Sequence, residues 1–306
     1  MRSIYVVAIF QCLCVSLIGQ DLKPGLPGMA PMKFITIKNT HAPGRVYQGI
    51  NGIGRTYTVE ETYFKAWIPA VVNSRFALAI APQYRTELFE LKSDEPSDIE
   101  RPSAWKLRSA GIDIKSMIRL NDLSWLIMTG NFTKSGDVAG SKLLDAPLSF
   151  TVSSVYLKRY STNTEFGFGL MANRANHFLV LPVIVYNHNF SSKSGIEISF
   201  PHKLAWRYNL RKSDILYAKA EASTRSYYIS SQRLQNSELF RRIDVDLGIA
   251  YNKQFTSFMG IELFAGYRQN ISNVLPHDVK AVTNSGWVGS LEIYFTPPAG
   301  IFRKGR

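Results

Sequence analysis

The chain has 306 residues, a formal net charge of +13 and a hydrophobic fraction of 45%, which is enough for one large domain or two ordinary ones. Its 36 Lys and Arg residues are scattered among predicted strands and turns. Nucleic-acid binding requires a basic patch, so this spread favours a solvated or anionic-lipid-facing surface instead. The aromatic fraction of 12%, mostly Tyr and Phe, is typical of a β-rich protein.

Residues 1–19 have the pattern of a signal peptide. A short basic start at Arg2 precedes an apolar run over residues 4–18, which is too short to span a bilayer comfortably. We expect cleavage after Gly19 and export of the mature chain. Both cysteines, Cys12 and Cys14, lie in this segment. The mature chain is therefore expected to have no disulfide, no thiolate metal site and no cysteine nucleophile.

Residues 20–55 are predicted as a Pro/Gly-rich N-terminal segment. Pro and Gly dominate residues 24–31, which indicates an extended linker, and residues 33–38 have the pattern of one short strand. Two placements stay open for this segment, a periplasmic tail or a course through the lumen of a barrel. We expect the barrel itself over residues 56–297, followed by a basic C-terminal tail over residues 298–306.

From residue 57 onward, apolar and polar residues alternate along long segments, and helical periodicity is absent. The predicted strands are 57–71, 75–91, 105–120, 124–134, 148–160, 165–173, 178–189, 195–210, 214–230, 241–254, 258–269 and 286–297. Most exceed the typical globular strand of about 5–6 residues. They reach the about 9–11 residues that a tilted transmembrane strand needs. This indicates an all-β protein, a single antiparallel transmembrane β-barrel of about 12 strands.

The faces of these segments support the same fold. In the last one, Trp287, Leu291 and Ile293 share one parity, and Ser290 and Glu292 share the other. Charges cannot face lipid, so we expect the charged parity of each strand to line the lumen. The predicted lumen-lining residues are Asp113, Lys115, Lys219, Glu221, Arg225, Asp244, Asp246, Glu262, Arg268 and Glu292. For Glu292 we expect a basic partner, either Arg268 or Lys65.

The turn lengths do not fit twelve strands. Bacterial barrels alternate short periplasmic turns with longer outer loops. The first predicted turn, at Asn73 and Ser74, is short where a long loop is due, whereas the final loop over residues 271–285 is long as expected. An additional early strand near residues 33–38 and a split of the 195–210 strand at Pro201 restore the parity. Fourteen strands are therefore the alternative count.

No constellation of a known catalytic or metal chemistry stands out. The five His residues are not clustered, so no metal site is predicted, and His277 is interpreted as ordinary loop polarity. No zinc-protease, hydrolase-elbow or phosphate-loop motif occurs in a suitable context. We expect no enzyme activity, no catalytic residue and no cofactor.

Several loose motifs resemble a known family. They are Leu181-Pro182, Tyr186-Asn187-His188-Asn189-Phe190, Gly195-Ile196-Glu197, Phe200-Pro201, Trp206-Arg207-Tyr208-Asn209-Leu210 and Ser213-Asp214-Ile215-Leu216-Tyr217. Through them, the span from about residue 56 to 297 resembles a Bacteroidota outer-membrane β-barrel family of unknown function. The resemblance implies the barrel fold and no catalytic residues. The chain departs from many barrels in continuing past Phe295 instead of stopping at a terminal aromatic residue.

Three functional interpretations follow from the sequence. The first is an outer-membrane barrel that acts as a small pore or transporter of polar solutes. The second is a non-conducting structural or scaffold barrel that binds partners through its outer loops. The third is a soluble periplasmic β-sandwich. For the barrel, the expected location is the outer membrane of a Gram-negative cell, and the expected partners are lipid and the barrel insertion machinery, with no nucleic acid.

Overall fold

The computed structural model describes residues 24–48, 54–93, 104–137, 140–174, 178–229, 238–274 and 285–297. The predicted signal peptide and the tail over residues 298–306 lie outside these ranges. The described residues contain one helix, the short 3-10 helix η2 (Gly140–Asp145). No helix in the described part of the chain is long and apolar enough to cross a membrane.

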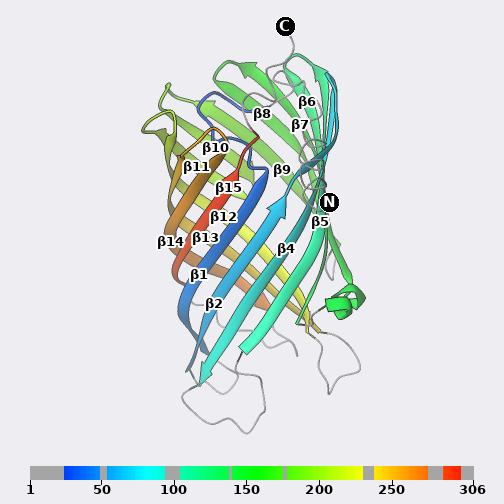
Figure 1. The fold of residues 1–306 in the computed structure, drawn as a ribbon, viewed down its shortest axis with the longest axis vertical. Coiled ribbons are helices and arrows are strands. Elements are labelled where there is room, and N and C mark those ends of the chain that lie inside the picture. The colour runs from blue at the N-terminus through cyan, green and yellow to red at the C-terminus, as the bar shows by residue number, and fades with distance from the viewer. Residues whose placement is uncertain are drawn as a thin grey trace, which may run out of the picture.

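The remaining elements are antiparallel strands that close into a barrel (Figure 1). The first seven are β1 (Ile35–Gln48), β2 (Gly54–Ala66), β3 (Ile68–Val72), β4 (Phe76–Ser93), β5 (Ala104–Asn121), β6 (Ser124–Gly136) and β7 (Leu148–Ser161). The others are β8 (Thr164–Arg174), β9 (Phe178–Asn189), β10 (Ser194–Phe200), β11 (Lys203–Asn209), β12 (Asp214–Ile229), β13 (Glu238–Gln254), β14 (Met259–Val274) and β15 (Gly286–Phe295).

Closure gives a barrel of 14 strands. β2 and β3 both pair with β4 and are separated only at Trp67, so they form one continuous strand of the wall. The first and last strands meet in register from Ile35↔Phe295 to His41↔Gly289. This seam removes the open edges that an unclosed sheet would expose. The β-sandwich alternative is therefore wrong.

The prediction of twelve strands is wrong, and the alternative of fourteen is confirmed. The missing early strand is β1, so the barrel begins at Ile35 instead of the predicted residue 56. The other missing boundary lies at Pro201, where the predicted 195–210 strand divides into β10 and β11. With both corrections, the start of β1 and the end of β15 lie at the same end of the barrel, which is called here the short-turn end. This end also carries the short turns before β4, β6, β8, β10, β12 and β14. The opposite end is called the long-loop end.

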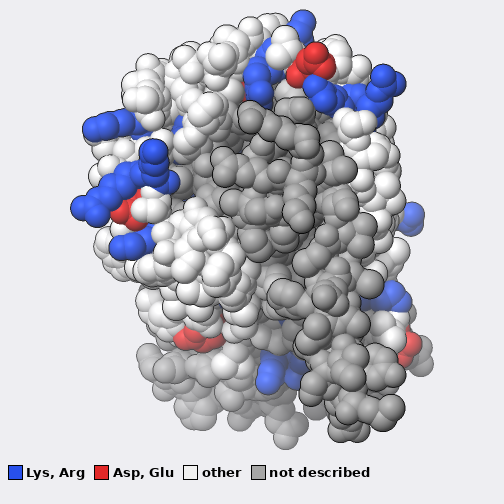
Figure 2. Space-filling view, turned by 45° about the horizontal axis from the view of Figure 1, so that its top comes forward, with Lys and Arg blue, Asp and Glu red and all other residues white. Residues whose placement is uncertain are grey.

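The wall is inverted relative to a globular protein. Large apolar side chains point outward, for example Trp287 at 72% exposure, Leu170 at 62% and Ile249 at 59%. Ionised side chains point inward and are buried, for example Glu87 at 0% and Arg242 at 1%. Only lipid matches such an apolar outer surface. Around the rim of the short-turn end, Lys and Arg outnumber Asp and Glu on the face shown in Figure 2.

Candidate functional site in the barrel interior

The N-terminal residues 24–34, called here the plug, enter the barrel at the short-turn end and cross its interior. On one side, the Gly25 amide donates to both carboxylate oxygens of Glu165 on β8 at 3.0 Å, and Arg159 on β7 donates to the Gly25 carbonyl at 2.9 Å. Asn189 on β9 donates to the Pro27 carbonyl at 3.0 Å. On the other side, the plug continues directly into β1. Of the two placements left open by the sequence, the course through the lumen is therefore the one observed.

Glycine is required where the plug meets the wall. Gly28 has φ of +81°, a left-handed backbone conformation that other L-residues rarely adopt. A Cβ atom there would lie 2.5 Å from both Arg207 Nη1 and Asn209 Nδ2 on β11. Leu26, two residues earlier, is 5% exposed. The Pro/Gly composition of this segment thus serves a close fit against the inner wall.

Lys33 anchors the other end of the plug. Its ammonium lies 2.9 Å from Glu262 on β14 and 2.6 Å from Glu292 on β15. Burial by itself would lower the pKa of Lys33, but the two carboxylates outweigh it and raise that pKa above its ordinary value. Lys33 therefore stays charged over the physiological range. Glu262 also pairs with Lys219 on β12 at 2.6 Å, so the anchor joins the plug to three strands.

A second group of ion pairs fills the interior next to β12, β13, β2 and β4. Arg242 on β13 lies 2.6 Å from Glu87 on β4 and 2.6 Å from Asp244 on its own strand. Tyr227 on β12 donates to Glu87 at 3.0 Å. Glu61 on β2 accepts from Arg225 at 3.2 Å and pairs with Arg85 at 3.0 Å. Pairs such as Arg242–Glu87 join strands that are not neighbours in the sheet, so they cross the interior.

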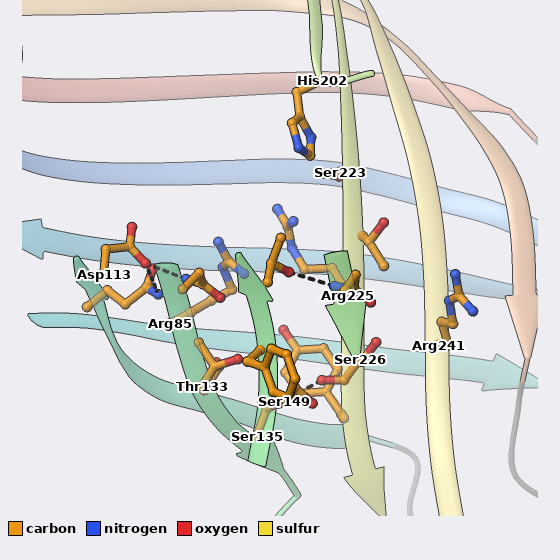
Figure 3. Close-up of a pocket in the computed structure, with 18 of the residues that line it drawn as sticks. Arg85, Asp113, Thr133, Ser135, Ser149, His202, Ser223, Arg225, Ser226 and Arg241 are labelled. Carbon is orange, nitrogen blue, oxygen red and sulfur yellow. Dashed lines mark hydrogen bonds between the residues drawn. The ribbon is translucent and has the colours of Figure 1, made fainter. Parts of the chain in front are cut away.

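A cavity of about 520 Å³ lies beside β6 to β9 and reaches across to β2, β4, β5 and β12. Small neutral side chains line much of it, among them Thr133, Ser135, Ser149 and Ser223 (Figure 3). Asp113 on β5 forms a polar cluster at one end, where it contacts Lys65 and Asn131 and accepts from Gln83 at 3.0 Å. His202, at the tip of the β10–β11 hairpin, also lines the cavity and lies at the top of the view in Figure 3.

The structure places the ten predicted lumen residues as follows. Asp113 belongs to the cavity cluster, Arg225 pairs with Glu61, and Lys219, Glu262 and Glu292 surround Lys33. Arg268 pairs with Asp246 at 2.5 Å and approaches Asp244 at 3.9 Å, and Glu221 pairs with Lys219 at 3.0 Å. Lys115 is half-buried on the same parity of β5 as Asp113.

The predicted partner of Glu292 is wrong. Its basic neighbour is Lys33, whereas Arg268 pairs with Asp246 and Lys65 pairs with Asp113. The sequence prediction also missed the buried residues Glu61, Glu87, Glu165 and Arg207. Glu61 and Glu87 each occur in a strand at the parity opposite to its lipid-facing residues, so the alternation was a usable signal. For Lys33 no local signal existed, because it precedes the barrel wall.

Among the described residues, no group of three or more His, Cys, Asp or Glu side chains is arranged to hold a metal ion. The charges of the interior are matched mainly with one another. What the arrangement offers chemically is a polar, partly filled interior that the plug crosses.

Comparisons with known proteins agree with this fold. Residues 146–274 match a family described as a domain of unknown function, DUF6268. No curated protein matches the chain. The structure resembles the COG4313 outer membrane channel from Pseudomonas putida F1, with a TM-score of 0.50, 12% identity, and coverage of 89% of this chain and 99% of that one.

Two further solved barrels resemble it less. The translocator domain of the autotransporter NalP from Neisseria meningitidis has a TM-score of 0.41 and 9% identity, covering 88% of this chain and 90% of that one. The toluene transporter TodX of Pseudomonas putida has a TM-score of 0.34 and 6% identity, covering 87% and 90%. At these identities the likeness concerns the fold alone, which is that of an outer-membrane β-barrel.

Proposed function

We propose that this chain is an outer-membrane channel for small polar solutes, closed at its short-turn end by the plug. The observation that carries the proposal is the course of residues 24–34 across the interior. These residues are held by hydrogen bonds to Glu165 and Asn189 and by the ion pairs of Lys33. Contacts of this kind are reversible. The plug is therefore suited to leave the lumen and return to it.

The interior supports the proposal in a second way. A wide pore requires no internal ion pairs, whereas this barrel contains a packed layer of them beside a cavity of about 520 Å³. A cavity of this size is within the range of small-molecule sites, about 300–1,000 Å³. The passage is accordingly narrow and suits small solutes.

The same proposal includes a place in the cell. It comprises a signal peptide over residues 1–19, insertion by the barrel insertion machinery and residence among the lipids of a Gram-negative outer membrane. The apolar run of residues 4–18 supports the signal peptide, and the outward apolar surface of the wall supports the residence among lipids. The resemblance in the sequence favours a Bacteroidota source. No catalytic step is part of the proposal.

Conductance in planar bilayers tests the channel. Deletion of residues 24–31 is expected to give a steady ionic current, while the unaltered protein conducts in rare openings. A milder variant is Lys33→Met, which removes the anchor between Glu262 and Glu292 and is expected to raise the open fraction. Lys212→Met is the matched control, because Lys212 is an exposed lysine in the β11–β12 turn at the same end.

Failure of the deletion variant to conduct, in a protein that still shows the heat-modifiable mobility of a folded barrel, would overturn the channel. A non-conducting structural or scaffold barrel would then be the better interpretation. If Lys33→Met and Lys212→Met raised the open fraction equally, charge at the rim, and not the anchor, would control the current.

A further inference from the structure

One inward lysine on β5 has no partner of opposite charge. Every other inward charged side chain of β5 to β9 belongs to an ion pair; the pairs are Asp113–Lys65, Arg119–Asp122 and Arg159–Glu165. Lys115 forms no ion pair with any residue that the structure describes. The unmatched charge on this side of the interior is therefore positive, and basic side chains that line a pore favour anions.

The register of the sheet places Lys115 in a row of inward residues that crosses five strands. In the order β5 to β9, the row consists of Lys115, Thr129, Ser153, Met171 and Leu181. Residues that are direct partners across neighbouring strands have their side chains on the same face of the wall. This is the inward face, because Asp113 and Asn131 of the next inward row contact each other at the cavity. The row therefore runs from a cation, through two hydroxyls, to two apolar side chains.

The first part of the row suits an anion. Thr129 Oγ1 and Ser153 Oγ lie 2.6 Å apart and share a hydrogen bond. Each hydroxyl carries one hydrogen, so one of the two hydrogens is left to donate to a ligand. Thr129 is exposed although it faces inward, which shows that open space lies in front of it. A carboxylate in this space would accept from the Lys115 ammonium and from a hydroxyl, and hydrogen bonds between ionised partners are the stronger kind.

The second part of the row is apolar. Met171 and Leu181 line the cavity of about 520 Å³. Val155 and Val183, one inward row closer to the plug, pack with Met171 into a cluster on the inner wall. The β10–β11 hairpin ends before β9 and β12 do, and His202 at its tip places Nε2 3.3 Å from Met171 Sδ. An apolar stretch of inner wall favours a solute that has an apolar part.

The row lies behind the plug as seen from the short-turn end. Met171 is on the same strand as Glu165, which holds the Gly25 amide. At 3.3–3.4 Å per residue, Met171 lies about 20 Å further along that strand. A solute that enters from the long-loop end therefore meets the cavity and this row before it reaches the plug.

We propose that this row binds a small monocarboxylate with a short apolar chain. The carboxylate lies between the Lys115 ammonium and the Thr129 hydroxyl, and the chain lies against Met171 and Leu181. Neighbouring strands are about 4.8 Å apart, so about 10 Å separates Thr129 from Met171, which a carboxylate of about six carbons spans. The inference rests on the proposed channel function and deepens it, because it names the class of small polar solute that the channel takes.

Hexanoate is the probe for the experiment, titrated into the full-length mature protein in lipid nanodiscs and followed by isothermal titration calorimetry, with empty nanodiscs as the blank. We expect saturable binding that Lys115→Met weakens at least about tenfold, because a charge-assisted hydrogen bond is lost. Lys106→Met is the matched control, since Lys106 is an exposed lysine on the outward face of the same strand, and unchanged binding is expected. Hexylammonium, which keeps the chain and reverses the charge, is expected to bind at least about tenfold more weakly to the unaltered protein.

The apolar end of the site is tested with a shorter acid. Acetate is expected to bind at least about tenfold more weakly than hexanoate, and Leu181→Ser is expected to remove most of this difference. Equal hexanoate binding by Lys115→Met and Lys106→Met, a preference for hexylammonium, or acetate binding as tight as that of hexanoate would each overturn the site. Plug-dependent conductance without hexanoate binding would refute this inference alone, whereas hexanoate binding without conductance would refute the channel alone.

Discussion

The two sides of the barrel interior differ although the wall around them follows one pattern. On β2, β4, β13 and β14 the inward positions carry long charged side chains, such as Glu61, Glu87, Arg242 and Glu262, which reach one another and fill the space. On β6 to β8 the inward positions carry Thr133, Ser135, Ser149 and Asn173, which are short and uncharged and leave a cavity. The difference shows that inward side-chain length, with the backbone pattern unchanged, decides which part of a barrel is solid and which is open.

The largest expected effect comes from breaking the filled side. Glu87→Leu leaves the buried guanidinium of Arg242 without its 2.6 Å partner across the interior. Removing one member of a buried ion pair typically costs about 3–5 kcal/mol. The free energy of unfolding, measured by urea titration in detergent micelles, is expected to fall by that amount.

The matched change on the open side is Asn173→Ala, which removes a hydrogen bond of 2.6 Å to Thr151. There the expected loss is at most about 1.5 kcal/mol, because water in the cavity replaces the lost partner. Equal losses for the two variants would mean that the two sides are equally packed.

On the outer surface the two sides of the barrel should not differ, and the expected loss of unfolding free energy is somewhat smaller than for Glu87→Leu. Ile249 on β13 and Phe168 on β8 are both 59% exposed. An arginine that faces the middle of the bilayer costs about 2–4 kcal/mol in such a wall. Ile249→Arg and Phe168→Arg are therefore expected to lower the unfolding free energy in bilayers by similar amounts. The control is Ser257→Arg in the exposed β13–β14 turn, where a change below about 0.5 kcal/mol is expected. A loss at only one of the two wall positions would show that the other does not face lipid.

The smallest effect on stability is expected from Gly28→Val in the plug. A left-handed backbone costs a residue with a side chain roughly 1–2 kcal/mol, and the new side chain also meets Arg207. The strain weakens docking of the plug and not the wall. We expect a higher open fraction in bilayer recordings and an unchanged temperature of the heat-modifiability transition. Met32→Val, at a plug position with 43% exposure, is the control. A lowered transition temperature without added current would show that the plug is part of the barrel's structural core.

Strand alternation was enough to predict the barrel and the inward parity, because the requirement that charges avoid lipid acts locally on every strand. The sequence pattern of Trp287, Leu291 and Ile293 against Glu292 agrees with their exposures of 72%, 44% and 36% against 8%. The strand count was less accessible. β1 is hard to recognise because Pro43 and Gly44 interrupt its alternation of apolar and polar residues. The turn at Pro201 and His202 lacks the Gly and Asn residues that usually mark a turn.

The interior partners could not be predicted in the same way. Glu87 and Arg242 are 155 residues apart, and Lys33 and Glu262 are 229 residues apart. Such pairs depend on the curvature and closure of the whole wall, which no local pattern encodes. The cavity likewise arises from the early end of the β10–β11 hairpin, and its place in the wall is fixed by register.

The seam between β1 and β15 also orders the assembly of the protein in time. Pairing of Ile35 with Phe295 joins residues from nearly opposite ends of the chain, and contacts of such long range form slowly. Next to this pair, the Phe34 amide donates to the Phe295 carbonyl at 2.6 Å, and Lys33 reaches Glu292 on the same strand. Closing of the β1–β15 seam therefore also brings Glu292 and the Phe295 carbonyl to the two plug residues that they bind.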